Sequence, residues 1–153
     1  MKGQELFELD GRVAVVIGGT TGLGREISLG FAAAGADVVA SSRETEHVDE
    51  VATAIEALGR RTLREECDVL DRASIQRLHN AVIAAFGKVD ILVNAAGMAK
   101  KVPTLDEDED EWLKIIDLFA DSDIFYRYFH FIRQRNNDTA FCSTVKFRQN
   151  KVK

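Results

Sequence analysis

The clearest hydrophobic pattern in the chain is an unbroken apolar run near the N-terminus. Arg12 to Ile17 is rich in β-branched residues with no polar alternation, as is typical of a central parallel strand buried on both faces. Apolar residues then recur at helical spacing from Leu23 to Ala34, and Gly35 follows where a left-handed C-terminal cap belongs. The pattern predicts a strand, a short glycine-rich loop and a helix.

The order of strand and helix then repeats. Asp37 to Ser41 is the second predicted strand, so Arg12 to Ser41 forms a βαβ unit of about 30 residues. An amphipathic helix follows through Val48 to Leu58 and is closed by Gly59. Thr62 to Cys67 is predicted as a third strand, and because it is rich in charge we place it at the outer edge of the sheet.

The next repeat has clear helix boundaries. Asp71 is a suitable N-cap for a helix with apolar residues on one face, and Gly87 ends that helix. Val89 to Asn94 is the fourth predicted strand. Strands that alternate with helices of this length predict an α/β fold of Rossmann type, a parallel sheet with helices on both faces.

The last third of the chain has a different pattern. An acidic run from Asp106 to Glu111 leads into a short helical pattern, and the helix dipole is a sufficient reason for acidic residues there. Aromatic residues then crowd between Phe119 and Ile132, most simply as a helix that covers the core, and a basic end follows in which Thr139 to Phe147 is a weak candidate strand.

This change of pattern sets the predicted domain boundary. Residues 1–117 are predicted to form an incomplete Rossmann-type domain whose sheet is truncated after the fourth or fifth strand. Residues 118–153 are predicted to be an atypical tail, aromatic at first and then basic. A genuine short protein and a truncated or frameshifted product of a longer gene both fit this pattern, and the abrupt change after Asp117 favours the second.

Composition narrows the class of partner. The 153 residues are 46% hydrophobic and 29% charged, which is ordinary for a globular protein, and the net charge of −5 argues against nucleic acid as the main partner. No run reaches the length of a membrane span, so we expect no membrane partner and a cytoplasmic location. Cys67 and Cys142 lack the spacing of metal ligands, and we expect reduced thiols and no metal.

The loop that follows the first strand carries the candidate chemistry. Gly18, Gly22 and Gly24 leave the backbone free of side chains at the start of a helix. Unpaired N–H groups and the positive end of the helix dipole favour an anion at that point. The loop therefore predicts a cradle for the diphosphate of a dinucleotide.

Three motifs together resemble the short-chain dehydrogenase/reductase family over the first 117 residues. Its glycine loop is matched at Gly18, Gly22 and Gly24, although Ile17 replaces the family threonine. Its Asn-Asn-Ala-Gly stretch is similar to the segment from Asn94 to Gly97. The resemblance implies an oxidoreductase that uses NAD or NADP, with Asp68 in the position of the aspartate that meets the adenine ring. The cofactor-binding residues so predicted are Gly18, Thr20, Thr21, Gly22, Leu23, Gly24, Ser41, Ser42, Arg43, Asp68, Val69, Asn94, Ala95, Ala96 and Gly97.

The end of the second strand indicates which dinucleotide is preferred. An acidic residue there would bind the ribose hydroxyls of NAD and repel a 2′-phosphate. This chain instead has Ser41, Ser42 and Arg43, which offer hydroxyl donors and a guanidinium, so we predict NADP in preference to NAD. Glu44 and Glu46 lie nearby and would weaken a phosphate site, and a plain surface role for Arg43 is the alternative.

The resemblance stops at the catalytic residues. The family protonates its substrate with a Tyr-x-x-x-Lys pair, but here Tyr126 is followed four positions later by His130, and Tyr128 by Ile132. Ser143 has roughly the place of the family serine, yet a plain serine is the simpler interpretation. We therefore assign no catalytic residue.

Two functions from different classes stay open. The first is a short-chain dehydrogenase/reductase that keeps the cofactor-binding half and is inactive alone, and the second is a noncatalytic nucleotide-binding or interaction module. The resemblance also implies a possible homo-oligomer through the helix that starts near Glu107. The histidines at 47, 79 and 130 are isolated in sequence, and we expect them to be surface or packing residues.

Overall fold

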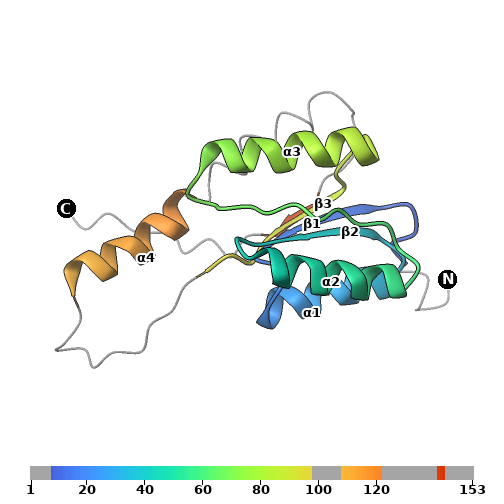
Figure 1. The fold of residues 1–153 in the computed structure, drawn as a ribbon, viewed down its shortest axis with the longest axis horizontal. Helices are drawn as coiled ribbons and strands as arrows, with labels where there is room; N and C mark the ends of the chain where they lie inside the picture. Colours follow the sequence, from blue (N-terminus) through green and yellow to red (C-terminus); the bar gives the residue numbers. More distant parts are fainter. Residues whose placement is uncertain (1–7, 98–107, 122–140, 144–153) are drawn as a thin grey trace.

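A parallel four-stranded sheet organises the part of the chain that the structure describes. The structure is a computed structural model, and it describes residues 8–97, 108–121 and 141–143 (Figure 1). The sheet has the order β2-β1-β3-β4, and every neighbouring pair of strands is parallel. Its strands are β1 (Val13–Ile17), β2 (Asp37–Ser41), β3 (Ile91–Asn94) and β4 (Phe141–Ser143).

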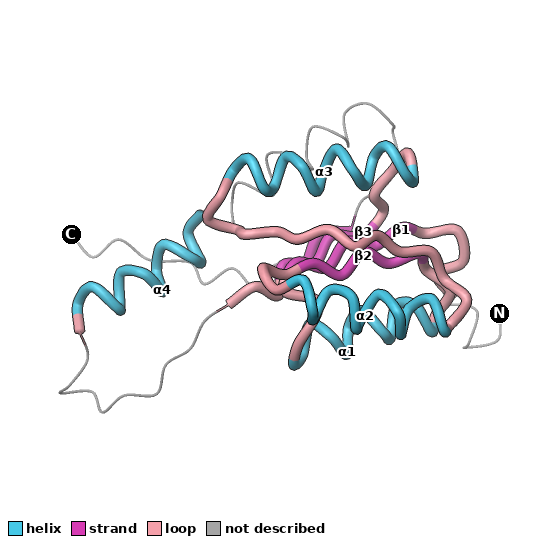
Figure 2. The backbone as a smooth tube through the Cα atoms, viewed as in Figure 1, coloured by secondary structure: helices cyan, strands magenta, loops and turns pink. Residues whose placement is uncertain are grey.

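Helices cover both faces of this sheet, as the sequence predicts. The helices are α1 (Gly22–Ala33), α2 (Thr45–Ala57), α3 (Arg72–Phe86) and α4 (Glu109–Asp121). Figure 2 shows α1 and α2 on one face and α3 on the other, while α4 lies to the side. Alternate residues of β1 divide between two apolar cores, because Val15 packs on the α3 side and Ala14 and Val16 on the α1 and α2 side. All five residues of β1 are buried, which confirms its prediction as the central strand.

The predicted helix boundaries are confirmed where capping chemistry specified them. The Asp71 carboxylate accepts a hydrogen bond from the Ala73 amide at 2.9 Å and so caps the N-terminus of α3. At the other end of α3, Gly87 has a φ of 76° in the left-handed region. Gly35 follows α1 with a φ of 106°, which a residue with a side chain would adopt only with strain.

The predicted third strand, Thr62 to Cys67, is wrong. The segment lies along the outer side of β2, where the Val38 amide donates to the Arg61 carbonyl and the Cys67 amide donates to the Ser42 carbonyl. It does not form a strand, and side chains hold it instead: the Arg64 guanidinium pairs with Glu56 of α2 at 2.6 Å. β2 is therefore the edge strand on this side of the described sheet, as β4 is on the other side, and the segment from Thr62 to Cys67 lies beyond β2 at the expected outer edge.

The remaining boundaries differ by a few residues. β3 begins at Ile91, two residues later than predicted, and the weak candidate strand near the C-terminus is present as Phe141–Ser143. α4 extends to Asp121, beyond the predicted domain boundary. Of the predicted aromatic helix between Phe119 and Ile132, the part after Asp121 lies outside the described residues. None of the helices described here has the length and apolar character that a bilayer crossing needs.

Candidate functional site

The candidate site lies at the carboxyl ends of three parallel strands. In the sheet register Ile17, the last residue of β1, lies opposite Ser41 of β2 and Asn94 of β3. The three segments that follow these strands therefore leave the sheet at the same edge. Two short hydrogen bonds continue the pairing there, from the Gly18 amide to the Ser41 carbonyl at 2.7 Å and from the Ala95 amide to the Ile17 carbonyl at 2.8 Å.

There is no room for a side chain at Gly18 and Gly19 of the loop between β1 and α1, or at Gly24 in the first turn of α1. A Cβ on Gly18 would lie 2.6 Å from the Ala96 nitrogen, and the φ of Gly18 is 71°. A Cβ on Gly24 would lie 2.0 Å from the Gly18 carbonyl oxygen. Because both contacts are shorter than van der Waals distance, the close approach of this loop to α1 and to the segment after β3 depends on glycine.

A buried hydroxyl group of α1 also fixes the position of this loop. The buried Ser28 hydroxyl of α1 lies 3.0 Å from the Gly19 carbonyl and 2.9 Å from the Gly24 carbonyl. No side chain caps the N-terminus of α1, and its first turn carries no acidic residue. The first amide groups of α1 are thus open to an anion, which the dipole of a 12-residue helix favours.

These elements surround a pocket of about 310 Å³. Its walls come from the glycine loop, the segment after β2, the approach to α3 and the segment after β3. The structure brings together most of the predicted cofactor-binding residues there, namely Gly18, Thr20, Thr21, Leu23, Gly24, Ser42, Arg43, Val69, Ala95, Ala96 and Gly97. The fit to a dinucleotide rests on the two glycine contacts, because a Cβ at either position would collide with the backbone of the pocket wall.

Four predicted residues are not among those that line this pocket, and the side chains of three of them form hydrogen bonds with backbone groups. The buried Ser41 hydroxyl donates to the Glu65 carbonyl at 2.6 Å. The Asp68 carboxylate accepts from the Leu70 amide at 2.9 Å, and the Asn94 side-chain oxygen accepts from the Ala96 amide at 3.1 Å. Gly22, with a φ of 51°, begins α1. Direct contact of these four residues with a cofactor stays a prediction.

The pocket also includes residues that the sequence analysis did not assign to it. They are Ile17, Glu44, His47, Cys67 and Leu70. Glu44 and His47 form one unit, because Oε2 of Glu44 lies 2.8 Å from Nδ1 of His47 across three positions of the chain. That spacing directly after Arg43, on a helix, is the signal that would have found them.

Cys67 is a wall residue and not a nucleophile. Its side chain is buried, and burial raises the pKa of the thiol to about 11, against a smaller opposing effect of the hydrogen bond with Ser74. A thiol with that pKa carries almost no thiolate at neutral pH. Cys67 thus contributes packing to the wall of the pocket.

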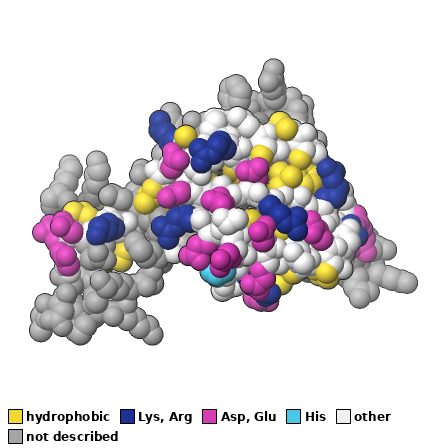
Figure 3. Space-filling view, in the orientation of Figure 1, with side chains coloured by type: hydrophobic (Ala, Val, Ile, Leu, Met, Phe, Trp, Pro, Cys, Tyr) yellow, Lys and Arg dark blue, Asp and Glu magenta, His cyan; other side chains and the backbone are white. Residues whose placement is uncertain are grey.

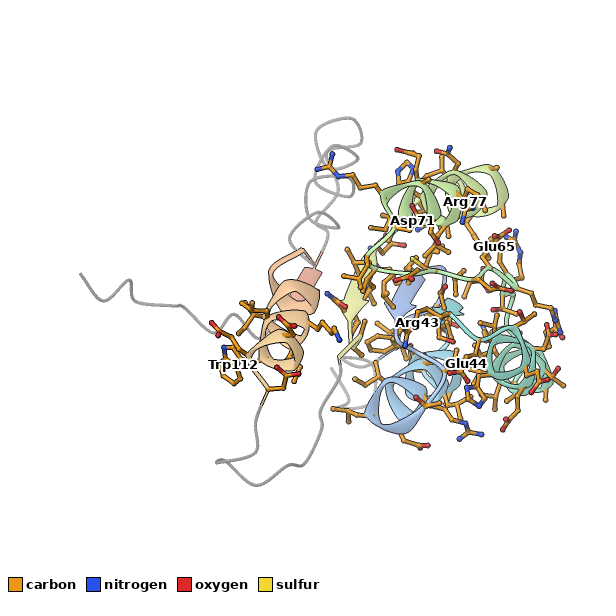
Figure 4. All side chains as sticks on the ribbon, turned by 60° about the vertical axis from the view of Figure 1, so that its left-hand side comes forward. Arg43, Glu44, Glu65, Asp71, Arg77 and Trp112 are labelled. Atoms are coloured by element: carbon orange, nitrogen blue, oxygen red, sulfur yellow. The ribbon has the colours of Figure 1, made fainter. Side chains whose placement is uncertain are left out.

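The surface around the pocket carries both signs of charge. Figure 3 shows Lys and Arg side chains interspersed with Asp and Glu on the face that it presents. Arg25 of α1 pairs with Glu26 at 3.2 Å, and Arg77 of α3 lies 3.9 Å from Asp71. In Figure 4, Arg43 and Glu44 lie at the carboxyl end of the sheet, where β2 leads into α2.

The residues considered for catalysis are placed apart from this pocket or outside the described part of the chain. Ser143 ends β4, and β4 pairs with β3 on the side away from β1. Tyr126, Tyr128 and His130 lie outside the described residues. Trp112 of α4 is 54% exposed and stands away from the sheet in Figure 4.

A family model and curated relatives both match this chain to dehydrogenases. The family model described as short chain dehydrogenase matches residues 12–125. The 2-dehydro-3-deoxy-D-gluconate 5-dehydrogenase of Pseudoalteromonas atlantica is 39% identical over 119 residues, which are 77% of this chain and 47% of that protein. The chain thus spans about half the length of the curated relatives that it matches.

Solved structures agree with this match. A short-chain type dehydrogenase/reductase from Mycobacterium marinum has a TM-score of 0.80 at 27% identity, covering 86% of this chain and 54% of that one. L-Sorbose reductase from Gluconobacter frateurii, complexed with NADPH and L-sorbose, has a TM-score of 0.75 at 29% identity, covering 84% of this chain and 50% of its own.

Proposed function

Since this chain belongs to the short-chain dehydrogenase family of NAD(P)-dependent oxidoreductases, we propose that it binds NADP(H) in the pocket at the carboxyl ends of β1, β2 and β3. The observation that carries the proposal is the glycine-lined wall of this pocket, where Gly18 and Gly24 admit no side chain. The complex of L-sorbose reductase with NADPH supports the choice of ligand.

Each part of the dinucleotide has residues suited to it. The glycine loop and the uncapped N-terminus of α1 hold the diphosphate through backbone amides. Ser42 and Arg43 hold the 2′-phosphate with a hydroxyl and a guanidinium. Val69, beside the predicted adenine-binding Asp68, lines the same pocket. When bound, the nicotinamide ring supplies a hydride donor or acceptor, and the protein supplies position and charge.

We further propose that the 153 residues alone do not transfer the hydride. Reduction of a carbonyl requires a proton donor at the oxygen, and neither Tyr126 nor Tyr128 is followed by a lysine four positions later. The chain then acts as the cofactor-binding part of an oxidoreductase. Its location in the cytoplasm and an oligomer built on α4, where Trp112 and Leu113 are 54% and 48% exposed, are proposals of the same kind.

Two measurements on the purified chain test this proposal. Titration of NADPH should give a saturable change in nicotinamide fluorescence, and a panel of ketones, sugar ketones included, should give no oxidation of NADPH above the rate without protein. The absence of any fluorescence change would reject the cofactor site. Oxidation that depends on both protein and ketone would instead reject the proposed inactivity.

A further inference from the structure

Two neighbouring residues of opposite charge at the pocket do not pair with each other. Arg43 and Glu44 both line the pocket, yet the Glu44 carboxylate lies 2.8 Å from the Nδ1 of His47. Among the residues that the structure describes, Arg43 makes no ion pair. The guanidinium of Arg43 therefore has no counter-ion among the described residues at the place proposed for the 2′-phosphate.

Other arginines among the described residues are paired with carboxylates. Arg25 of α1 pairs with Glu26 at 3.2 Å, and Arg64 pairs with Glu56 at 2.6 Å and with Asp49 at 3.3 Å. Glu44 is the residue closest in sequence that could do the same for Arg43. Its carboxylate is turned instead to a residue of the first turn of α2.

The contact with His47 is close. Oε2 of Glu44 lies 2.8 Å from Nδ1 of His47, a distance at which an imidazole that carries a proton on Nδ1 attracts the carboxylate. Glu44 is also the N-cap residue of α2, but its side chain caps no backbone amide, so the histidine is the partner that fixes it. The side chains are 65% exposed for Glu44 and 44% exposed for His47, so the pair lies at the mouth of the pocket and not in the core.

We propose that His47 is a positioning residue for cofactor selection. By holding the Glu44 carboxylate on α2, it prevents Glu44 from neutralising Arg43 and leaves the guanidinium to the 2′-phosphate. Glu44 is then a specificity-determining residue, because its negative charge repels the phosphate. The contact with His47 weakens this repulsion by holding the carboxylate away from Arg43. This inference rests on the proposed function, since it concerns the phosphate that distinguishes NADP from NAD.

A surface pair that only stabilises α2 would have different consequences. Such a pair at positions i and i+3 would affect helix stability and would change NADPH and NADH binding alike. The proposed role instead requires that loss of His47 weakens the binding of NADPH and not of NADH, and that this effect depends on the Glu44 carboxylate. A double-mutant cycle separates the two roles.

The experiment measures the dissociation constants of NADPH and NADH for the full chain and four variants. The variants are His47→Ala, Glu44→Gln, the combination of both, and Glu46→Gln as the control. Glu46 is an exposed acid in the first turn of α2 that does not line the pocket, so its substitution removes the same charge at a different place. Circular dichroism and thermal unfolding establish that each variant is folded.

We expect His47→Ala to weaken the binding of NADPH about fivefold, because the released Glu44 carboxylate is an exposed negative charge near the phosphate. The binding of NADH should weaken less than about twofold. Glu44→Gln should tighten NADPH by a few fold, and in that background His47→Ala should have no further effect. Because Glu46 does not line the pocket, Glu46→Gln should change the ratio of the two constants less than Glu44→Gln does.

The inference would be overturned if His47→Ala weakened the binding of NADPH and NADH equally. It would also be overturned if His47→Ala had the same effect on NADPH binding in the wild-type and the Glu44→Gln backgrounds. Either result would leave the proposed function standing. A wild-type chain that binds neither dinucleotide would reject the proposed function and this inference with it.

Discussion

The position of Gly24 illustrates how a single atom decides the shape of the pocket. An added methyl group would stand 2.0 Å from the Gly18 carbonyl oxygen, which is a backbone atom and not the end of a flexible side chain. Gly30 provides the matched control, since it belongs to the same helix and a Cβ there meets nothing within 4 Å.

We therefore predict opposite results for two substitutions of the same kind. Gly24→Ala should destabilise the chain by about 1–3 kcal/mol and abolish NADPH binding, because the loop must move away from α1. Gly30→Ala should raise stability by about 0.5–1 kcal/mol and leave binding unchanged, because alanine costs less backbone entropy in a helix. Urea unfolding and NADPH fluorescence check both, and unchanged binding by Gly24→Ala would contradict the assignment of the loop.

Residue types could be predicted at this scale, but their pairing could not. The glycines and Arg43 stand out in the sequence because each has a direct chemical reason at its place. The sequence analysis treated Glu44 only as a charge near Arg43 and His47 only as a surface or packing residue. Which carboxylate pairs with which cation depends on side-chain rotamers at the start of α2, and these are fixed by three-dimensional contacts.

At the scale of elements, a buried carboxylate joins the amino ends of β1 and β3. Asp90 is 8% exposed and accepts hydrogen bonds from the Val13 amide at 2.8 Å, the Lys88 ammonium at 2.9 Å and the Arg12 guanidinium at 3.2 Å. Burial alone would raise the pKa of this carboxyl, but the hydrogen bonds from Lys88, Val13 and Arg12 outweigh burial and hold the pKa below its ordinary value.

The lowered pKa of Asp90 predicts how its contribution to the stability of the fold depends on pH. An aspartate with a lowered pKa in the folded state stabilises the fold above its unfolded pKa of about 3.9, and this stabilisation is lost as the pH falls through the folded pKa. Asp90→Asn should cost about 1–3 kcal/mol at pH 7. Urea unfolding of both proteins should show that difference shrinking towards pH 3, and a difference independent of pH would contradict the role of the carboxylate.

Elements with strong local signals could be predicted, whereas the edge of the sheet could not. α3 follows from the cap at Asp71 and the glycine at Gly87, and β1 from its unbroken apolar run. Thr62 to Cys67 has the composition of an edge strand, but whether it forms one depends on a few backbone hydrogen bonds to β2. In the structure its side chains bond to α2 instead, through Arg64 and through the contact of Glu66 with Thr45.

At the scale of the whole molecule, parallel strands bring distant segments to one edge. The glycine loop, Arg43 and the segment from Ala95 to Gly97 are far apart in sequence but line one pocket, because the strands before them end at the same level. The alternation of strands and helices predicts the parallel sheet, and the resemblance to the family supplied most of the residues at its edge. The predicted division of the chain at residue 117 stays a prediction.

In the proposed function the pocket binds NADP(H) and recognises its 2′-phosphate through Arg43. The most direct test compares the dissociation constants of NADPH and NADH for the wild-type chain and for Arg43→Ala. We predict that the wild-type chain binds NADPH at least about tenfold more tightly than NADH, and that Arg43→Ala removes most of this difference, as loss of a charged hydrogen bond implies. Equal affinities in the wild-type chain, or an equal loss for both dinucleotides in the variant, would contradict the account.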